Sequence, residues 1–156
     1  MNQASDIHLL IPIADAEGGE HVIAGAAALW PGSVARIVNV WRTAETQLEM
    51  ASPMAVGGID FAELDQAIAR DAQTAAERGA EYARSLGLDA AGQALGTDGP
   101  VWKRILEDAD EQGIQAIVTG SRGRGDISSA LLGSTSHALL HHSKVPVTVV
   151  PPGHPS

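Results

Sequence analysis

The sequence predicts an α/β fold in which an open, doubly wound, Rossmann-like parallel sheet of five strands carries helices on both faces. Short apolar runs, which suit strands buried on both faces, alternate with longer stretches of helical periodicity. Alanine is prominent and aromatic residues make up only 3% of the chain, so we expect an aliphatic core with close contacts between elements. A length of 156 residues suits one domain, 1–156, and we expect its end, 151–156, to be a disordered tail.

The first elements are a strand, a helix and a second strand. The almost continuous apolar run 7–13 predicts a strand covered on both faces. After a break at 14–19, the alanine-rich stretch 20–30 predicts a helix that Pro31-Gly32 ends. The run 34–41 predicts a second strand, which should pair parallel to the first after a right-handed crossover.

A long connection and a long helix follow. The segment 42–59 has no periodicity, and we expect a long loop of the kind that forms lids. Asp60 should cap the next helix, with Glu63 as the second member of a capping box, and Gly87 should end it. Three- and four-residue steps place its expected buried stripe at Phe61, Leu64, Ile68, Ala72, Ala75, Gly79, Tyr82 and Leu86.

The second half of the chain predicts three further strands and two helices. The segment 93–96 is expected to be a short edge strand despite its poor β-propensity, because the alternation needs one there. A helix begins at Asp98-Gly-Pro100 and ends at Gly113, facing inward with Val101, Ile105, Leu106 and Ala109. The remaining elements are a strand at 114–119, a helix at 134–142 and a strand at 145–150.

Composition excludes several classes of function. The formal net charge is −9, with ten basic against nineteen acidic residues, so a broad nucleic-acid interface is not expected. Cysteine is absent, which rules out disulfides, thiol nucleophiles and thiolate metal sites. The N-terminus lacks the basic start of a signal peptide and no apolar run reaches transmembrane length, so we expect a cytoplasmic protein that does not bind membranes.

The segment from Gly120 to Ser136 is the candidate ligand site. It follows the β-branched strand 114–119 with glycines at 120, 123 and 125, which can adopt positive φ and let backbone approach a ligand. Gly133 then precedes a helix whose first residues, 134–136, are all hydroxylic, with Ser134 a candidate N-cap. Free amides and the positive end of a helix dipole favour phosphate, to which Arg122 and Arg124 could add charge.

The spacing Gly120-x2-Gly123-x9-Gly133-Ser134 resembles the nucleotide-binding signature of the universal stress protein family. The final helix and the Val-Pro-Val run at 145–147 are also similar to the end of that family's domain. The resemblance implies strand order 3-2-1-4-5 and non-covalent binding of ATP or AMP, with Mg²⁺ as a possible companion of the phosphates. Carried over by resemblance, the nucleotide-binding residues are Pro12, Ile13, Asp15, Val40, Gly120, Arg122, Gly123, Gly133, Ser134, Thr135 and Ser136.

One departure from the family pattern leaves two alternatives open. Nucleotide-binding members commonly carry an Asp directly after the first Val-Pro-Val-like run, whereas here Ile11-Pro12-Ile13 is followed by Ala14, and Asp15 comes one residue later. Either Asp15 serves in a shifted loop, or the protein binds nucleotide weakly or not at all.

The resemblance further implies a stress-responsive regulatory module that forms a homodimer through the strand Val145 to Val150. Two other functions stay open: a nucleotide-free dimeric interaction protein of the same family, and a nucleotide hydrolase or transferase. The residues indicate no nucleophile, base and orienting group in a common pattern, so at most slow ATP hydrolysis is expected.

Some residues have two interpretations. His137 and His141, four apart on one helix, could present two imidazoles to a metal, or could be exposed side chains near a helix C-terminus. Asp126 could hold Mg²⁺ against phosphates. Trp30, Trp41 and Trp102 are expected to be core or interface anchors rather than ligand platforms.

Overall fold

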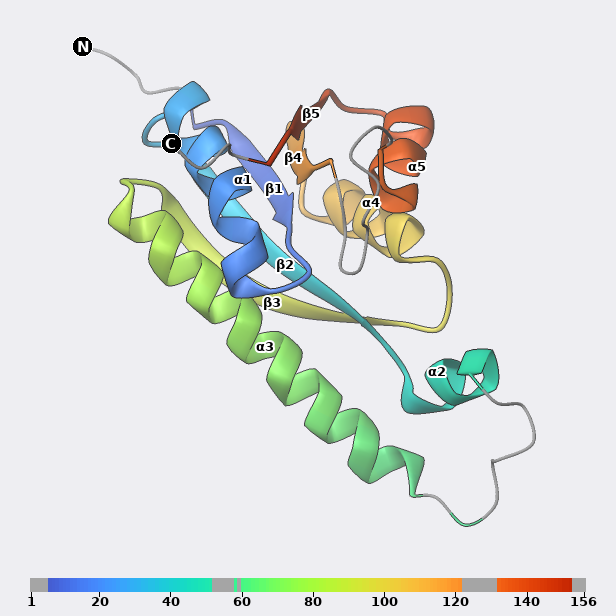
Figure 1. Ribbon diagram of the computed structural model, residues 1–156. Helices are drawn as coiled ribbons and strands as arrows, with labels where there is room; N and C mark the ends of the chain where they lie inside the picture. Colours follow the sequence, from blue (N-terminus) through green and yellow to red (C-terminus); the bar gives the residue numbers. More distant parts are fainter. Residues whose placement is uncertain (1–5, 52–57, 59, 122–131, 153–156) are drawn as a thin grey trace.

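Ten helices and strands make up the computed structural model, which describes residues 6–51, 58, 60–121 and 132–152. In chain order they are β1 (His8–Pro12), α1 (Ala16–Leu29), β2 (Val34–Arg42), α2 (Ala44–Ala51), α3 (Phe61–Ser85), β3 (Asp89–Thr97), α4 (Val101–Glu111), β4 (Ala116–Gly120), α5 (Ser134–His142) and β5 (Val147–Val150). The strands form one sheet in the order β3-β2-β1-β4-β5, and all four pairings are parallel (Figure 1). The predicted fold class and strand order are confirmed.

Helices cover both faces of the sheet, and the alternation of side chains along β1 explains how. Leu9 and Ile11 point to the face covered by α1 and α3, whereas Leu10 points to the face covered by α4 and α5. All three side chains are fully buried, as an apolar run in a central parallel strand predicts. The central strands are therefore fixed on both sides, which places the carboxyl ends of β1 and β4 at a defined position.

Helix α1 begins four residues earlier than the predicted helix at 20–30. Asp15 is its N-cap, and the Asp15 carboxylate accepts a hydrogen bond from the Gly18 amide. Gly18 and Gly19, which suggested a break in the sequence, lie inside the first turns of this helix. A Cβ on Gly19 would come within 2.5 Å of Cγ2 of Ile13. A glycine is needed there because α1 packs tightly against the end of β1.

The expected long loop at 42–59 contains a helix, α2, which the sequence pattern did not predict. Thr43 accepts a hydrogen bond from the Thr46 amide through its hydroxyl, and the Ala44 amide donates to the Asp65 carboxylate at 2.7 Å. A side chain of α3 thus satisfies an amide in the first turn of α2. The helix depends on this tertiary contact, which single-sequence periodicity does not report.

The Asp60 cap of α3 is confirmed, since its carboxylate accepts a hydrogen bond from the Glu63 amide at 3.3 Å. The predicted buried stripe is only partly right: Leu64 and Leu86 are exposed by 45% and 40%. Leu64 is exposed because the N-terminal turns of α3 run past the sheet towards α2, whereas its C-terminal half lies on β2 and β3 (Figure 1). Leu86 is the C-cap that follows the last helical residue. The buried residues of α3 are Ala72, Ala76, Gly79, Ala80 and Ala83.

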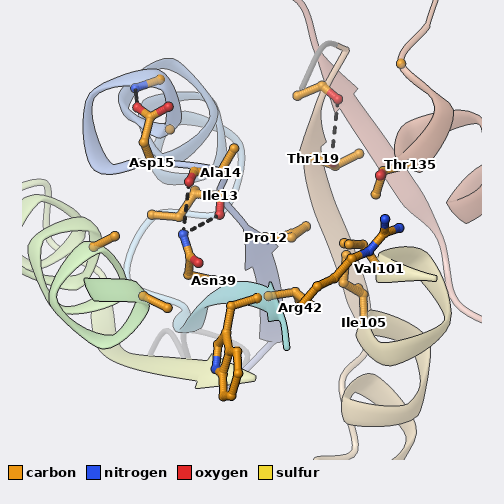
Figure 2. A pocket seen from close by; sticks show the side chains of 18 of the residues that line it. Pro12, Ile13, Ala14, Asp15, Asn39, Arg42, Val101, Ile105, Thr119 and Thr135 are labelled. Atoms are coloured by element: carbon orange, nitrogen blue, oxygen red, sulfur yellow. Dashed lines mark hydrogen bonds between the residues drawn. The ribbon is translucent and has the colours of Figure 1, made fainter. Parts of the chain in front are cut away.

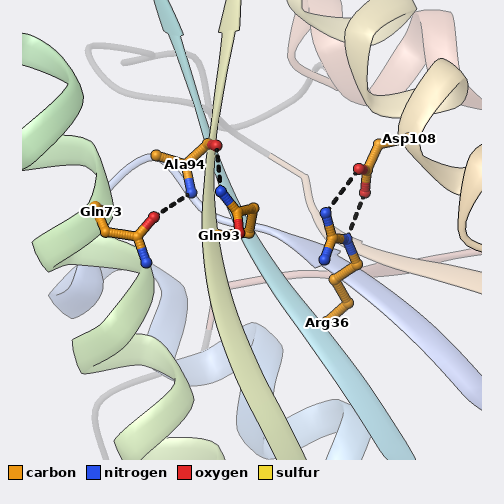
Figure 3. Close-up of polar contacts among 5 residues, drawn as sticks. All are labelled: Arg36, Gln73, Gln93, Ala94 and Asp108. Carbon is orange, nitrogen blue, oxygen red and sulfur yellow. Dashed lines mark hydrogen bonds and ion pairs between the residues drawn. The ribbon is translucent and has the colours of Figure 1, made fainter.

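Strand β3 spans nine residues instead of the predicted 93–96 and pairs with β2 along its whole length. Small residues, which lower its β-propensity, allow α3 to approach, since a Cβ on Gly92 would come within 2.5 Å of the Ala76 backbone. Gln73 of α3 also reaches the strand backbone, because its side chain accepts a hydrogen bond from the Ala94 amide at 2.8 Å (Figure 3). The same side chain donates to the Gly92 carbonyl at 3.1 Å. Tertiary packing therefore stabilises this edge strand.

The last third follows the prediction closely. Helix α5 has the predicted bounds, while β4 begins at Ala116 and β5 at Val147, two residues later than predicted in each case. Helix α4 follows Pro100 and buries Ile105 and Ala109 as expected.

An ion pair lies between α4 and β2. Arg36 donates two hydrogen bonds to Asp108, from Nε to Oδ2 at 2.7 Å and from Nη2 to Oδ1 at 2.8 Å (Figure 3). The Asp108 side chain is 2% exposed and that of Arg36 23%. Hydrogen bonding to Asp108, opposed in part by burial, raises the pKa of Arg36. A buried carboxylate is thereby fully paired by a bidentate guanidinium.

Candidate functional site

A cavity of about 1140 Å³ opens at the carboxyl ends of β1, β2 and β4 (Figure 2). The chain leaves β1 towards α1 on one face of the sheet and leaves β4 towards α5 on the other. The two neighbouring strands therefore diverge at this point, which is the topological switch point where open α/β sheets bind ligands.

Nine of the eleven predicted nucleotide-binding residues line this one cavity, although they come from four separate segments. They are Pro12, Ile13, Asp15, Val40, Gly120, Gly133, Ser134, Thr135 and Ser136. Arg122 and Gly123 lie outside the described residues, as do Arg124, Gly125 and Asp126. The fold brings together residues that are more than a hundred positions apart in the sequence.

Hydrogen bonds from β2 fix the turn after β1. The Asn39 side-chain amide donates to the carbonyls of Ile13 at 3.2 Å and Ala14 at 3.0 Å, and the Ile13 amide donates to the Val38 carbonyl at 2.9 Å (Figure 2). Asn39 is buried, so these bonds satisfy a side chain that would be costly to leave unpaired. The turn that carries Asp15 therefore has a defined position at the cavity.

On the opposite side of the cavity, α5 is attached to the end of β4. The Gly133 amide donates to the Ser121 carbonyl at 2.6 Å, and the Ser136 hydroxyl donates to the Gly120 carbonyl. The N-cap is Gly133 and not Ser134, which is the first helical residue and exposed. With no side-chain cap, the first amides of α5 are left for another acceptor at the positive end of the helix dipole.

Gly120 does not use the positive φ that a glycine can adopt. Among the described residues, positive φ occurs at Gly32, Gly58, Gly87 and Gly113, outside the cavity lining. Gly120 is instead the last residue of β4 and keeps strand geometry because it pairs with Val150 of β5.

Six polar residues of the cavity lining were not among the predicted site residues: His21, Asn39, Arg42, Gln47, Asp71 and Thr119. His21 and Asp71 lie on helices α1 and α3, and no sequence signal pointed to them. Asn39 precedes the predicted Val40, and Arg42 follows it by two residues. The two-residue period of a strand was the available signal, because it places Arg42 on the same side as Val40. Asn39 lies on the other side of β2.

Arg42 extends from the end of β2 towards α4 and the first turn of α5. Its side chain runs past Val101 and Ile105, and its guanidinium lies on the side of the cavity where Thr135 is found (Figure 2). Arg42 Nη1 is 3.3 Å from Sδ of Met50, a weak acceptor. Arg42 Nε is buried without a hydrogen-bond partner, and so is Nε2 of His21.

The histidine pair of α5 is exposed, as its second interpretation proposed, with the His137 and His141 rings 4.7 Å apart. In the part of the chain that the structure describes, no group of three or more potential metal ligands occurs. Trp30 and Trp102 pack against the two cores, and Trp102 stacks on His142 at 4.5 Å. Trp41 differs from that expectation because it lines the cavity.

None of the helices described here is long and apolar enough to cross a membrane.

Comparison with known proteins connects this chain to a family. The family model of the universal stress protein family matches residues 8–151. Universal stress protein YxiE of Bacillus subtilis is 35% identical over 74 residues, which cover 47% of this chain and 49% of YxiE. Universal stress protein Mb2028c of Mycobacterium bovis is 44% identical over 52 residues, 33% of this chain and 17% of that protein. The matched segments thus span less than half the length of these two relatives.

Solved structures share the fold over nearly the whole chain. Hypothetical protein MJ0577 superimposes with a TM-score of 0.76 at 19% identity, covering 96% of this chain and 99% of that one. The universal stress protein of Archaeoglobus fulgidus in complex with dAMP gives a TM-score of 0.60 at 18% identity, over 92% and 97% of the two chains. A universal stress protein in complex with cAMP gives 0.62 at 16% identity, over 96% and 98%. The chain belongs to the universal stress protein family.

Proposed function

We propose that this protein binds an adenine nucleotide, ATP or AMP, non-covalently in the cavity at the carboxyl ends of β1, β2 and β4. The observation that carries this proposal is that nine nucleotide-binding residues, predicted from the family resemblance and coming from four separate segments, line one cavity. Two relatives of the same fold are described as complexes with dAMP and cAMP, which supports an adenine nucleotide as the class of ligand.

The geometry divides the cavity into two ends. At one end, Asp15 and the turn fixed by Asn39 offer a carboxylate and backbone groups to a nucleoside, and Val40 offers an apolar contact to a base. At the other end, the uncapped amides of α5 and the hydroxyls of Ser134 and Thr135 suit phosphate oxygens. Mg²⁺ would accompany a triphosphate through phosphate oxygens and few protein ligands.

The proposed role is regulation by binding, not turnover. The Ser136 hydroxyl donates to the Gly120 carbonyl, which does not activate the hydroxyl as a nucleophile. We propose a cytoplasmic, stress-responsive module in which the bound nucleotide orders the cavity walls that a protein partner recognises. A homodimer through β5 fits the sheet order, because β5 is an edge strand whose outer backbone side has no partner in the described sheet.

The test is mass spectrometry of the small molecules released by denaturing freshly purified protein, followed by calorimetric titration with ATP and AMP. We expect about one adenine nucleotide per chain in either experiment. The variant Thr135→Val should weaken binding several-fold, whereas Thr74→Val on the exposed side of α3 should not. Absence of any nucleotide binding would contradict the proposal.

A second function, a nucleotide-free dimeric interaction protein, is favoured by one specific observation. The Asp15 carboxylate already accepts the Gly18 amide as the cap of α1, and exposed Ala14 stands where relatives commonly carry Asp. If this function is the right one, the wild-type protein binds no nucleotide but is a dimer by light scattering. A hydrolase or transferase would in addition release phosphate from ATP in the presence of Mg²⁺.

A further inference from the structure

We propose that Arg42 makes the cavity select ligands that carry phosphate over the corresponding neutral nucleoside. This inference rests on the proposed function and adds a residue outside the Gly120-x2-Gly123-x9-Gly133-Ser134 signature. It assigns the charge selectivity of the site to a side chain at the end of β2 and not to the glycine-rich segment that follows β4.

The position of Arg42 follows from strand geometry. Arg42 is the last residue of β2, two residues after Val40, so both side chains project to the same side of the strand. From there the Arg42 side chain crosses the cavity wall along Val101 and Ile105 towards α5 (Figure 2). Its guanidinium therefore lies between the strand end that carries Val40 and the helix start that carries Thr135.

The hydrogen bonds of Arg42 are incomplete in a way that points to a ligand. A guanidinium has five N–H donors, and burying one of them without an acceptor is costly. Among the described residues, Arg42 Nε has no partner and the acceptor of Nη1 is the thioether of Met50. Among the described residues the one ion pair is that of Arg36 with Asp108, so no described carboxylate neutralises Arg42. An anionic group in the cavity would supply the missing acceptors.

The charges of the cavity lining explain why the Arg42 cation should control the binding of phosphate. Arg42 is the single arginine or lysine among the described lining residues, while Asp15 and Asp71 contribute two carboxylates. The whole chain carries a formal charge of −9. A phosphate group would enter a negative environment, and the local positive groups on the described wall are the Arg42 guanidinium and the amides of α5.

The experiment is calorimetric titration of the full chain with ATP, AMP and adenosine, using wild type, Arg42→Met and Arg42→Lys. Arg78→Met, which removes an exposed arginine of α3 outside the cavity, is the matched control. Losing a charge-assisted hydrogen bond should weaken ATP and AMP binding in Arg42→Met by roughly 10- to 100-fold. Adenosine affinity should change less than about twofold, and Arg42→Lys should restore part of the loss because a point charge remains.

The salt dependence gives an independent readout. The wild-type affinity for AMP should fall as ionic strength rises, and this dependence should become shallower in Arg42→Met but not in Arg78→Met. Circular dichroism and thermal unfolding establish that each variant is folded; should Arg42→Met not fold, Arg42→Gln replaces it with a neutral hydrogen-bonding side chain.

Three results would overturn the inference. An equal loss of adenosine and AMP affinity would show that Arg42 contacts the base or the ribose. Unchanged affinity for all three ligands would show that Arg42 does not contact the ligand. If the wild type binds neither nucleotide nor nucleoside, the proposed function fails together with this inference, whereas the first two results leave the proposed function intact.

Discussion

Arg36 and Arg42 are two arginines on the same side of the same strand, and their environments are opposite. Arg36 lies in the part of β2 that α4 covers, where the buried Asp108 accepts two of its hydrogen bonds. Arg42 lies six residues on, at the end of β2, where its Nε has no acceptor and a thioether is its hydrogen-bond partner. Within the described part of the chain, one guanidinium is paired with a carboxylate and the other is not.

The difference separates structural from ligand-binding charges. A fully paired charge fixes the packing of a helix on a sheet, and its loss is measured in stability. An unpaired charge at a cavity lowers stability slightly, and evolution retains it where a ligand completes its hydrogen bonds. The same substitution at the two positions should therefore affect different measurements.

The largest expected effect is that of Arg36→Met. The Asp108 carboxylate would be left buried without a partner, which should cost about 3 kcal/mol of unfolding free energy. Urea denaturation followed by circular dichroism measures this loss. Because the pKa of Arg36 is raised, its contribution is complete at neutral pH and disappears only as the pH rises through the folded-state value.

The double variant Arg36→Met with Asp108→Leu is the control for this prediction. Replacing both charges by apolar side chains should recover most of the stability, because no buried charge is left unpaired. If Arg36→Met alone has wild-type stability, the Arg36–Asp108 ion pair does not stabilise the fold, and the proposed difference between Arg36 and Arg42 is wrong.

Asn39→Ala should have the second largest effect and should change both stability and binding. It leaves the carbonyls of Ile13 and Ala14 without their side-chain donor, at a cost of about 1–2 kcal/mol. The turn after β1 then loses its attachment to β2, and nucleotide affinity should fall with it. Thermal unfolding and titration of the same sample measure the two effects, and a loss of stability with unchanged affinity would separate the turn from the site.

Substitutions of Asp15 distinguish capping from ligand binding. Asp15→Ala removes the N-cap of α1 and should cost about 1 kcal/mol, whereas Asp15→Asn keeps a good capping residue and should cost little. If the carboxylate contacts the nucleoside, both variants lose affinity for AMP. Full affinity in Asp15→Asn would show that Asp15 acts as a cap alone.

Arg42→Met should have the smallest effect on stability, within about 0.5 kcal/mol of wild type, because no described carboxylate pairs with the cation that it removes. Urea denaturation without ligand measures it beside Arg36→Met. A loss as large as that of Arg36→Met would remove the distinction between the two arginines.

Local patterns in the sequence were enough to predict most of the fold. Leu9, Leu10 and Ile11 are buried on alternate faces as an apolar run predicts, and the Asp60 cap is present where its spacing from Glu63 indicates it. The exceptions have tertiary causes. Strand β3 is long because Gly92 lets α3 approach and Gln73 of α3 hydrogen-bonds to the strand backbone. Helix α2 begins with an amide bonded to Asp65 of another helix.

The candidate site was predictable where the chain carries a continuous motif. Gly133 to Ser136 lie together in the sequence and together at the cavity. Arg42 and Asn39 were missed because each has an ordinary strand position, and what distinguishes them is what lies opposite: carbonyls for Asn39, and no carboxylate for Arg42 among the described residues. A side chain's partners depend on packing between elements that are distant in the sequence.

Trp41 gives the cavity an optical reporter. Its indole lies so close to Gly96 that a Cβ there would come within 2.8 Å of Cζ2, and the same residue lines the cavity. The rigid contact with β3 holds the chromophore in place, so displacement of water from its other side changes its emission. Trp30 and Trp102 pack against the two cores and do not line the cavity, so their emission should change less. The proposed nucleotide binding should therefore change the intrinsic fluorescence of the unlabelled protein.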